Sequence, residues 1–249
     1  MGKKQLDNLY DDDFDLSILP VKTDNQSINI RRPFHPMLPD ISKGALTMLL
    51  ASVRSGKSVC ACNLLCNSNF YRDCFDAVYV FSSTINQDST GRKIKEMFPN
   101  TCYDTFDENR LQKIIDYQAQ QDPDERESIA IILDDLPNYL KPKSLFFTLS
   151  SNYRHFGIGL LLYSQQAYKQ VSPIVRSNLT NFIIGTINQS QLDLVAKDFG
   201  EQFAGIENFK KYYRLAVPER FNFLYGRLDQ YPAILHKAFD EKILYQDDY

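Results

Sequence analysis

The sequence contains no uninterrupted apolar run of about 18 residues, the length that a membrane-spanning helix needs. Its beginning is charged and acidic, which is not the composition of a signal peptide. It has no internal repeat and no cysteine and histidine spacing typical of a zinc site. Basic residues do not predominate, since the net charge is −3. We therefore expect no transmembrane segment, and any contact with nucleic acid must come from a local patch or an assembled pore.

The five cysteines are an odd number, and three of them, Cys60, Cys62 and Cys66, lie on one predicted helix. Cys62 and Cys66 are four positions apart and could share a metal ion, but no further ligands follow at a suitable spacing. We interpret them as buried, reduced thiols that pack as small apolar side chains. This interpretation fits a reducing cytosolic compartment.

A chain of 249 residues with 43% hydrophobic and 24% charged residues has the composition of a globular protein with a substantial core. Residues 1–40 are expected to form an extension, because they contain an acidic stretch at 11–15 and a proline-punctuated stretch at 31–39. This extension is either irregular or a strap that docks on a partner. Residues 41–249 are expected to form one domain.

The most informative segment is an apolar run, Ala45 to Leu50, that leads into a near match to the phosphate-binding consensus G-x-x-x-x-G-K-[ST]. A helical pattern, Val59 to Asn67, completes the strand–loop–helix arrangement that the motif requires. In such a loop the lysine neutralises phosphate oxygens and the last hydroxyl holds Mg²⁺. The sequence therefore predicts ATP and Mg²⁺ as cofactors, although an ordinary turn with a surface lysine is the alternative. The residues expected to surround the nucleotide are Ala51, Ser52, Val53, Arg54, Ser55, Gly56, Lys57 and Ser58, with Ser58 as a magnesium ligand.

Ala51 departs from this consensus, because the first position of the loop is usually glycine. If the position needs a positive φ, alanine strains the loop by roughly 1 kcal/mol or more. If it does not, the substitution is harmless.

Apolar strands alternate with helical patterns through most of the chain. Expected strands cover 76–82, 128–134, 157–164 and 181–186, and expected helices cover 108–121, 143–153 and 190–199. This alternation predicts an α/β fold, a doubly wound and mainly parallel sheet with helices on both faces. Beyond Phe209 the chain is rich in aromatic residues, Tyr212 and Tyr213 among them, and residues 220–227 alternate, which predicts extra edge strands.

Two adjacent carboxylates, Asp134 and Asp135, follow the buried run at 129–133. In P-loop enzymes an acid at the end of a neighbouring strand holds Mg²⁺, and we assign Asp134 to that task. Asp135 is then placed to orient the attacking water or accept its proton. The next strand ends at Gln165, which is expected to hydrogen-bond the γ-phosphate or that water, with Gln166 as the second choice. Each of these residues could instead cap a turn or a helix.

The loop with Lys57, the acids Asp134 and Asp135, the pair Arg154–His155 and the strand-ending Gln165 together resemble one family. They are similar to the genome-packaging ATPases of large double-stranded DNA viruses and virophages, within the FtsK–HerA superfamily of P-loop DNA pumps. The resemblance extends from about residue 43 to about residue 188 and is most specific over 151–165.

This resemblance implies a ring of identical subunits that hydrolyses ATP at their interfaces. It implies an arginine acting on the neighbouring subunit's nucleotide, for which Arg154 and Arg176 are the candidates. It further implies a translocase that packages double-stranded DNA into a preformed capsid, with backbone contacts from lysines such as Lys141, Lys143 and Lys169. Viral capsid or membrane-associated virion proteins are the expected further partners. The expected location is the virus assembly site in the host cytoplasm, and the virion.

Two other functions remain open on the sequence alone. A nucleoside or nucleotide kinase would share the phosphate loop and the acid-tipped strand, but no arginine-bearing lid is recognisable. A scaffold that binds ATP without hydrolysing it is the other alternative, and only Ala51 favours it.

Overall fold

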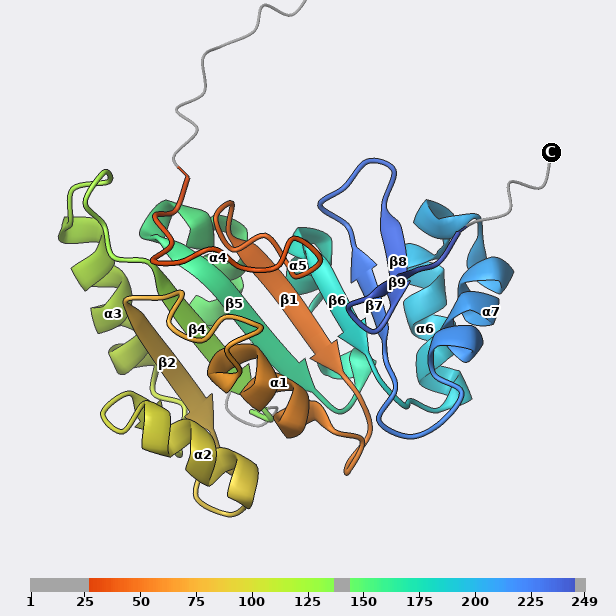
Figure 1. Ribbon diagram of the computed structural model, residues 1–249, viewed down its shortest axis with the longest axis horizontal. Helices are drawn as coiled ribbons and strands as arrows, with labels where there is room; N and C mark the ends of the chain where they lie inside the picture. Colours follow the sequence, from red (N-terminus) through yellow and green to blue (C-terminus); the bar gives the residue numbers. More distant parts are fainter. Residues whose placement is uncertain (1–26, 137–143, 245–249) are drawn as a thin grey trace, which may run out of the picture.

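The computed structural model describes residues 27–136 and 144–244. Their strands form one nine-stranded sheet in the order β3-β2-β4-β5-β1-β6-β7-β8-β9 (Figure 1). The first six strands in this order are parallel, and β7, β8 and β9 continue the sheet in antiparallel fashion. The predicted fold class, with edge strands added by the C-terminal part of the chain, is therefore confirmed.

The parallel strands are β1 (Ala45–Leu50), β2 (Ala77–Ser82), β3 (Cys102–Tyr103), β4 (Ile129–Asp134), β5 (Ile158–Gln165) and β6 (Asn181–Ile184). The antiparallel ones are β7 (Leu224–Arg227), β8 (Ile234–Lys237) and β9 (Glu241–Lys242). The helices are α1 (Lys57–Cys66), α2 (Ser89–Met97), α3 (Glu108–Gln120), α4 (Leu145–Asn152), α5 (Pro173–Asn178), α6 (Gln189–Phe199) and α7 (Ile206–Ala216). Short 3₁₀ helices η1 (Tyr153–Phe156), η2 (Tyr168–Gln170) and η3 (Gly200–Phe203) connect them.

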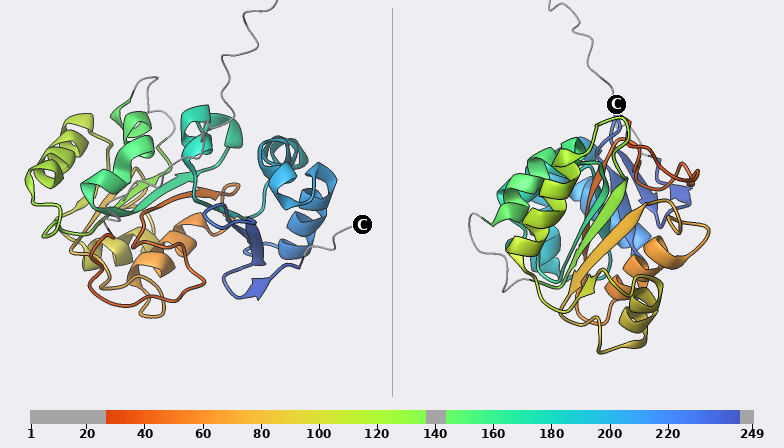
Figure 2. Two further views of the ribbon diagram at one scale, coloured as in Figure 1. Left: turned by 90° about the horizontal axis from the view of Figure 1, so that it is seen from above. Right: turned by 90° about the vertical axis from the view of Figure 1, so that its left-hand side faces the viewer.

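Helices cover both faces of the sheet, as Figure 2 shows. One face packs against α3 to α7, and the other packs against α1, α2 and the segment before β1. Every residue of β1, β4 and β5 is buried. Continuous burial of this kind explains why these strands read as unbroken apolar runs, since both faces of a parallel sheet are covered.

One secondary-structure expectation is wrong. Tyr212 and Tyr213 lie in helix α7 and not in edge strands. Together with Phe209 and Ala216 they bury one face of that helix, at the three- and four-residue spacing of a helical stripe. Aromatic content favoured strands, but this spacing was the better indicator. The helix α2 was not expected, because only Gly91 and Ile94 of its residues are buried.

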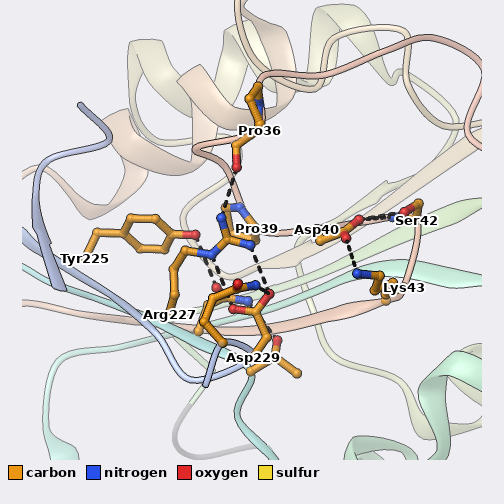
Figure 3. A network of polar contacts seen from close by, with 12 residues as sticks. Pro36, Pro39, Asp40, Ser42, Lys43, Tyr225, Arg227 and Asp229 are labelled. Atoms are coloured by element: carbon orange, nitrogen blue, oxygen red, sulfur yellow. Dashed lines mark hydrogen bonds and ion pairs between the residues drawn. The ribbon is translucent and has the colours of Figure 1, made fainter. Parts of the chain in front are cut away.

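The segment 27–40 packs against the same domain. Leu38 is buried in the core on the α1 face, and the Tyr71 hydroxyl donates to the carbonyl of Pro39 at 2.6 Å. Figure 3 shows the Arg227 guanidinium donating to the Pro36 carbonyl at 3.0 Å while it pairs with Asp229. The acidic stretch at 11–15 lies outside the described residues. Within the described ranges, no helix has the length and apolar character needed to cross a membrane.

Candidate functional site

The site lies where the carboxyl ends of β1, β5 and β4 meet, at the lower edge of the sheet in Figure 1. Strand β5 is the middle one, with Gln165 opposite Leu50 of β1 and Ser164 opposite Asp134 of β4. The acid-bearing strand is thus not adjacent to β1. Gln165 lies between the phosphate loop and the acids, as expected for a group that contacts the γ-phosphate or the attacking water.

The loop after β1 is anchored by its own backbone. Ala51 N–H donates to the Gln165 carbonyl at 3.2 Å, and Ser52 N–H donates to the Thr186 carbonyl at 2.9 Å. Positive φ angles occur at Arg54 (59°) and Gly56 (89°) but not at Ala51. Alanine is therefore unstrained at the first loop position, and the tight turn is made at the loop's other end.

Lys57 opens helix α1 and is buried, although it is a lysine. Its ammonium donates to the carbonyls of Ala51 at 2.8 Å and Ser52 at 3.2 Å. Burial lowers the pKa of Lys57, and the nearby carboxylates of Asp135 and Asp134 oppose that shift. The ammonium therefore lies inside the loop, where it could donate to phosphate oxygens instead of to these carbonyls.

Asp134 ends β4 and is almost completely buried. Its Oδ2 accepts from the Ser82 hydroxyl at 3.1 Å, while its Oδ1 has no hydrogen-bond partner among the described residues. Burial raises the pKa of this carboxyl, and the neighbouring hydroxyl groups of Ser164 and Ser82, together with the charge of Lys57, oppose the rise.

Ser58 and Asp134 line the same small cavity, together with Ser82 and Thr84. A carboxylate and hydroxyl groups on one cavity are oxygen ligands of the kind that Mg²⁺ takes, although apolar side chains make up most of this lining. The two predicted ligands, Ser58 and Asp134, are thus brought together, and their chemistry fits the predicted metal.

Asp135 takes a left-handed backbone conformation, with φ 55°. Its two carboxylate oxygens accept from the side-chain amide of Gln166 at 2.8 and 2.6 Å. Gln166, the second choice for the sensing residue, therefore holds the candidate general base. Residues 137–143 lie outside the described residues, so the predicted DNA contacts Lys141 and Lys143 are not placed.

Gln165 is fully buried, and within the described part of the chain neither its amide oxygen nor its amide nitrogen has a hydrogen-bond partner. Leaving a buried amide unsatisfied costs about 1–3 kcal/mol, so such groups usually have a reason to be there. The position between the loop and Asp134 supplies one, because a bound phosphate or water would satisfy the amide.

The two candidate arginines lie away from this edge. Arg154 is exposed on η1, and its side chain packs beside Gly44, just before β1. Arg176, on α5, pairs with Asp198 at 2.9 Å and lies 4.3 Å from the Tyr168 ring centre. Neither belongs to the nucleotide site of its own chain. Lys169 is exposed on η2, directly after β5.

Ser82 and Gln166 are site residues whose partners the sequence did not indicate. Ser82 ends β2, and β2 pairs with β4 so that Ser82 lies opposite Asp134. The expected strand at 76–82 contained the signal, since polar residues at the carboxyl ends of adjacent parallel strands meet at one edge.

The sheet order, the phosphate loop and the acids at the end of β4 together define a P-loop NTPase fold. A genome packaging NTPase, B204 from Sulfolobus turreted icosahedral virus 2, has the same fold in its sulfate complex. The TM-score is 0.54, with 16% sequence identity over 81% of this chain and 98% of that one. The complex of B204 with ATP-gammaS gives a TM-score of 0.51 at 16% identity, over 78% and 96% of the two chains.

The DNA-packaging ATPase B204 from Sulfolobus turreted icosahedral virus gives a TM-score of 0.53 at 15% identity, over 77% of this chain and 96% of that one. The family resemblance inferred from the sequence is thus confirmed at the level of the fold. Comparison of the sequence itself with models of known families and with curated proteins gives no match.

Proposed function

We propose that this protein is an ATP-driven motor that moves double-stranded DNA and packages a viral genome into a preformed capsid. The observation that carries the proposal is the buried Gln165, which ends the strand between β1 and β4 and whose side-chain amide has no hydrogen-bond partner among the described residues. This arrangement occurs in a fold shared with viral genome packaging NTPases.

The chemistry is hydrolysis of the bond between the β- and γ-phosphates. The loop holds the triphosphate with its backbone N–H groups, and Lys57 neutralises its charge. Ser58 and Asp134 would hold Mg²⁺, which would further neutralise the charge of the phosphate oxygens. Asp135, held by Gln166, accepts the proton of the attacking water as that water bonds to the γ-phosphorus and ADP leaves. Gln165 hydrogen-bonds the γ-phosphate or the water and so distinguishes the ATP state from the ADP state.

The distant arginines support a ring of subunits. Arg154 and Arg176 are too far from their own site to stabilise its transition state, whereas a neighbouring chain could receive one of them. A trans-acting arginine is worth orders of magnitude in rate. Arg154 is the better candidate, because it is exposed, while Arg176 is engaged with Asp198 and Tyr168.

Contact with DNA is proposed to be with its phosphate backbone, and Lys169 is the described lysine best placed for it. Such binding weakens steeply with salt and ignores base sequence. The motor would act at the virus assembly site in the host cytoplasm and remain in the virion. Residues 1–26 are the proposed contact with capsid or membrane-associated virion proteins.

Steady-state hydrolysis of ATP with and without double-stranded DNA tests the proposal. We expect turnover that rises severalfold on addition of DNA and loses the increase at high salt. Turnover that requires a nucleoside as acceptor would identify a kinase instead. Nucleotide binding without any turnover, in the presence of DNA and Mg²⁺, would identify a scaffold.

A further inference from the structure

A second cavity, of about 530 Å³, adjoins the phosphate loop on the α1 face of the sheet. Its volume lies within the range of cavities that hold small molecules, about 300–1,000 Å³. The lining is mainly apolar and aromatic, and it includes Phe70, Phe221, Phe223 and Phe239. None of these residues belongs to the hydrolytic machinery described above.

The cavity is continuous with the loop. Ala51, Ser55, Gly56 and Lys57 line it, and so do residues of the first two turns of α1, Val59 among them. If the phosphates of a nucleotide bind at the amino end of α1, its sugar and base can extend along the side of that helix. The cavity lies on that side.

Two residues in the far wall of the cavity have strained backbone conformations. Phe221 (φ 74°) and Ala238 (φ 53°) both line it, and both take the left-handed conformation that residues with side chains avoid. Strain of this kind gathers at sites where a ligand is bound. Ala238 N–H donates to the Phe223 carbonyl at 3.0 Å, which fastens the two strained turns to each other.

Phe221 is the most telling of these residues. Its ring lies against Gly56, where an added Cβ would meet the ring at 3.2 Å. The side chain is nevertheless 64% exposed, although it is large and apolar. The Arg220 guanidinium carbon lies over this ring, 5.5 Å from its centre. The exposed remainder of the ring, directly beside a phosphate loop, offers a surface on which a planar ligand can stack.

We propose that this cavity receives the nucleobase and sugar of the nucleotide, with Phe221 stacking on the base. This rests on the proposal that the loop holds a triphosphate. Asn63, Asn222 and Asp240 line the cavity with groups that can hydrogen-bond the edge of a base. The amide of Asn63 is already used within α1, where it donates to the Val59 carbonyl and accepts from Asn67.

The absence of tryptophan from the sequence provides a direct test. Phe221→Trp places one tryptophan in the cavity wall, and its fluorescence is followed as ATP, GTP or inorganic tripolyphosphate is added with Mg²⁺. We expect quenching by both nucleotides and none by tripolyphosphate, which has the phosphates without the base. Tyr117→Trp, at an exposed position on α3, is the matched control and should respond to none of them.

Calorimetry of Phe221→Ala completes the test. We expect the affinity for ATP and GTP to fall by about tenfold, the size of one aromatic stacking contact, with the affinity for tripolyphosphate unchanged. Equal loss for all three ligands, or quenching by tripolyphosphate, would overturn the proposal. If nucleotides and tripolyphosphate all fail to bind the unaltered protein, the phosphate-loop proposal itself is wrong.

Discussion

The side-chain amide of Gln166 donates to both carboxylate oxygens of Asp135, at 2.8 and 2.6 Å, across the ends of two adjacent strands. The carboxylate is thereby fixed in one orientation, while Asp134 beside it faces the cavity shared with Ser58. Two neighbouring acids thus have different surroundings, which fits the different tasks proposed for them.

Removing this contact should slow hydrolysis without weakening nucleotide binding. We expect Gln166→Ala to lower kcat by about tenfold with little change in KM, because Asp135 remains present but is no longer oriented. Asp135→Asn should lower kcat by about 100-fold or more, the contribution of a general base. Gln170→Ala, at an exposed position on η2, serves as the control in the same steady-state assay. A Gln166→Ala enzyme with normal kcat would contradict the positioning role.

The unpartnered amide of Gln165 predicts a conflict between stability and activity. Gln165→Met keeps the volume and removes the buried polar atoms, so the free energy of unfolding should rise by about 1–2 kcal/mol while hydrolysis is lost. Thermal unfolding checks the expected gain in stability, and steady-state ATPase measurements on the same preparation check the expected loss of hydrolysis.

The matched control for this variant is Gln118→Met. Gln118 is similarly buried, and its amide nitrogen donates to the Glu127 carbonyl at 2.9 Å, while its amide oxygen has no partner among the described residues. That variant should keep its activity and gain less stability than Gln165→Met, because it also removes a hydrogen bond. A stabilised Gln165→Met that still hydrolyses ATP at the normal rate would show that the amide is not part of the site.

The buried carboxyl of Asp134 lowers the free energy of unfolding by an amount that depends on pH. Burial raises the pKa of its carboxyl in the folded state, so ionisation at neutral pH costs stability that the protonated form does not. We expect Asp134→Asn, without nucleotide, to be more stable than the unaltered protein at pH 7. The difference should shrink as the pH falls through the raised pKa and vanish below about pH 3, where the carboxyl is protonated in both the folded and the unfolded protein. Urea unfolding across this range measures it, and a difference that is constant with pH would refute the explanation.

Ala51 and Gly185 form a pair that can be exchanged. A Cβ added to Gly185 would lie 3.0 Å from the Ala51 Cβ, so Gly185→Ala alone should destabilise the protein by about 1–3 kcal/mol. Ala51→Gly alone should cost about 0.5–1 kcal/mol through backbone entropy, and it should not speed hydrolysis, because Ala51 has no positive φ to relieve. The double variant should recover most of the loss from Gly185→Ala. Additive losses in unfolding experiments would show that the two methyl groups do not compete for the same space.

The trans-acting arginine can be tested by mixing subunits. Lys57→Ala should abolish hydrolysis, and Arg154→Ala should reduce it by about 1,000-fold without loss of stability, since the side chain is exposed. Mixed together, the two inactive proteins should regain activity, because some interfaces then pair an intact Lys57 with a neighbour's intact Arg154. Lys113→Ala, on the exposed face of α3, is the control for Lys57→Ala. No recovery in mixed rings would remove Arg154 from consideration and leave Arg176.

The sequence was most informative for residues that belong to a short motif at a junction between a strand and the segment that follows it. Lys57 and Ser58 open the helix that follows β1, and Asp134 ends β4, so a local pattern suffices to predict them. A local pattern could not assign separate contacts to Gln165 and Gln166. The two consecutive side chains have different surroundings, and only the pairing of β4 with β5 determines which of them contacts the acids. Phe221 falls within residues 220–227, for which only edge strands were expected. Its position beside Gly56 depends on a contact between distant parts of the chain, which a local pattern does not contain.

The position of β5 limits how the loss of phosphate can produce movement. All residues of β1 pair with β5 on one side, and β4 pairs with it on the other. A strand held along both edges cannot slide without breaking the sheet. In the proposed motor, Gln165 would therefore report hydrolysis by turning its side chain and not by shifting its backbone. The movement would leave the sheet through the segment that follows β5, where Tyr168 contacts the Arg176–Asp198 pair.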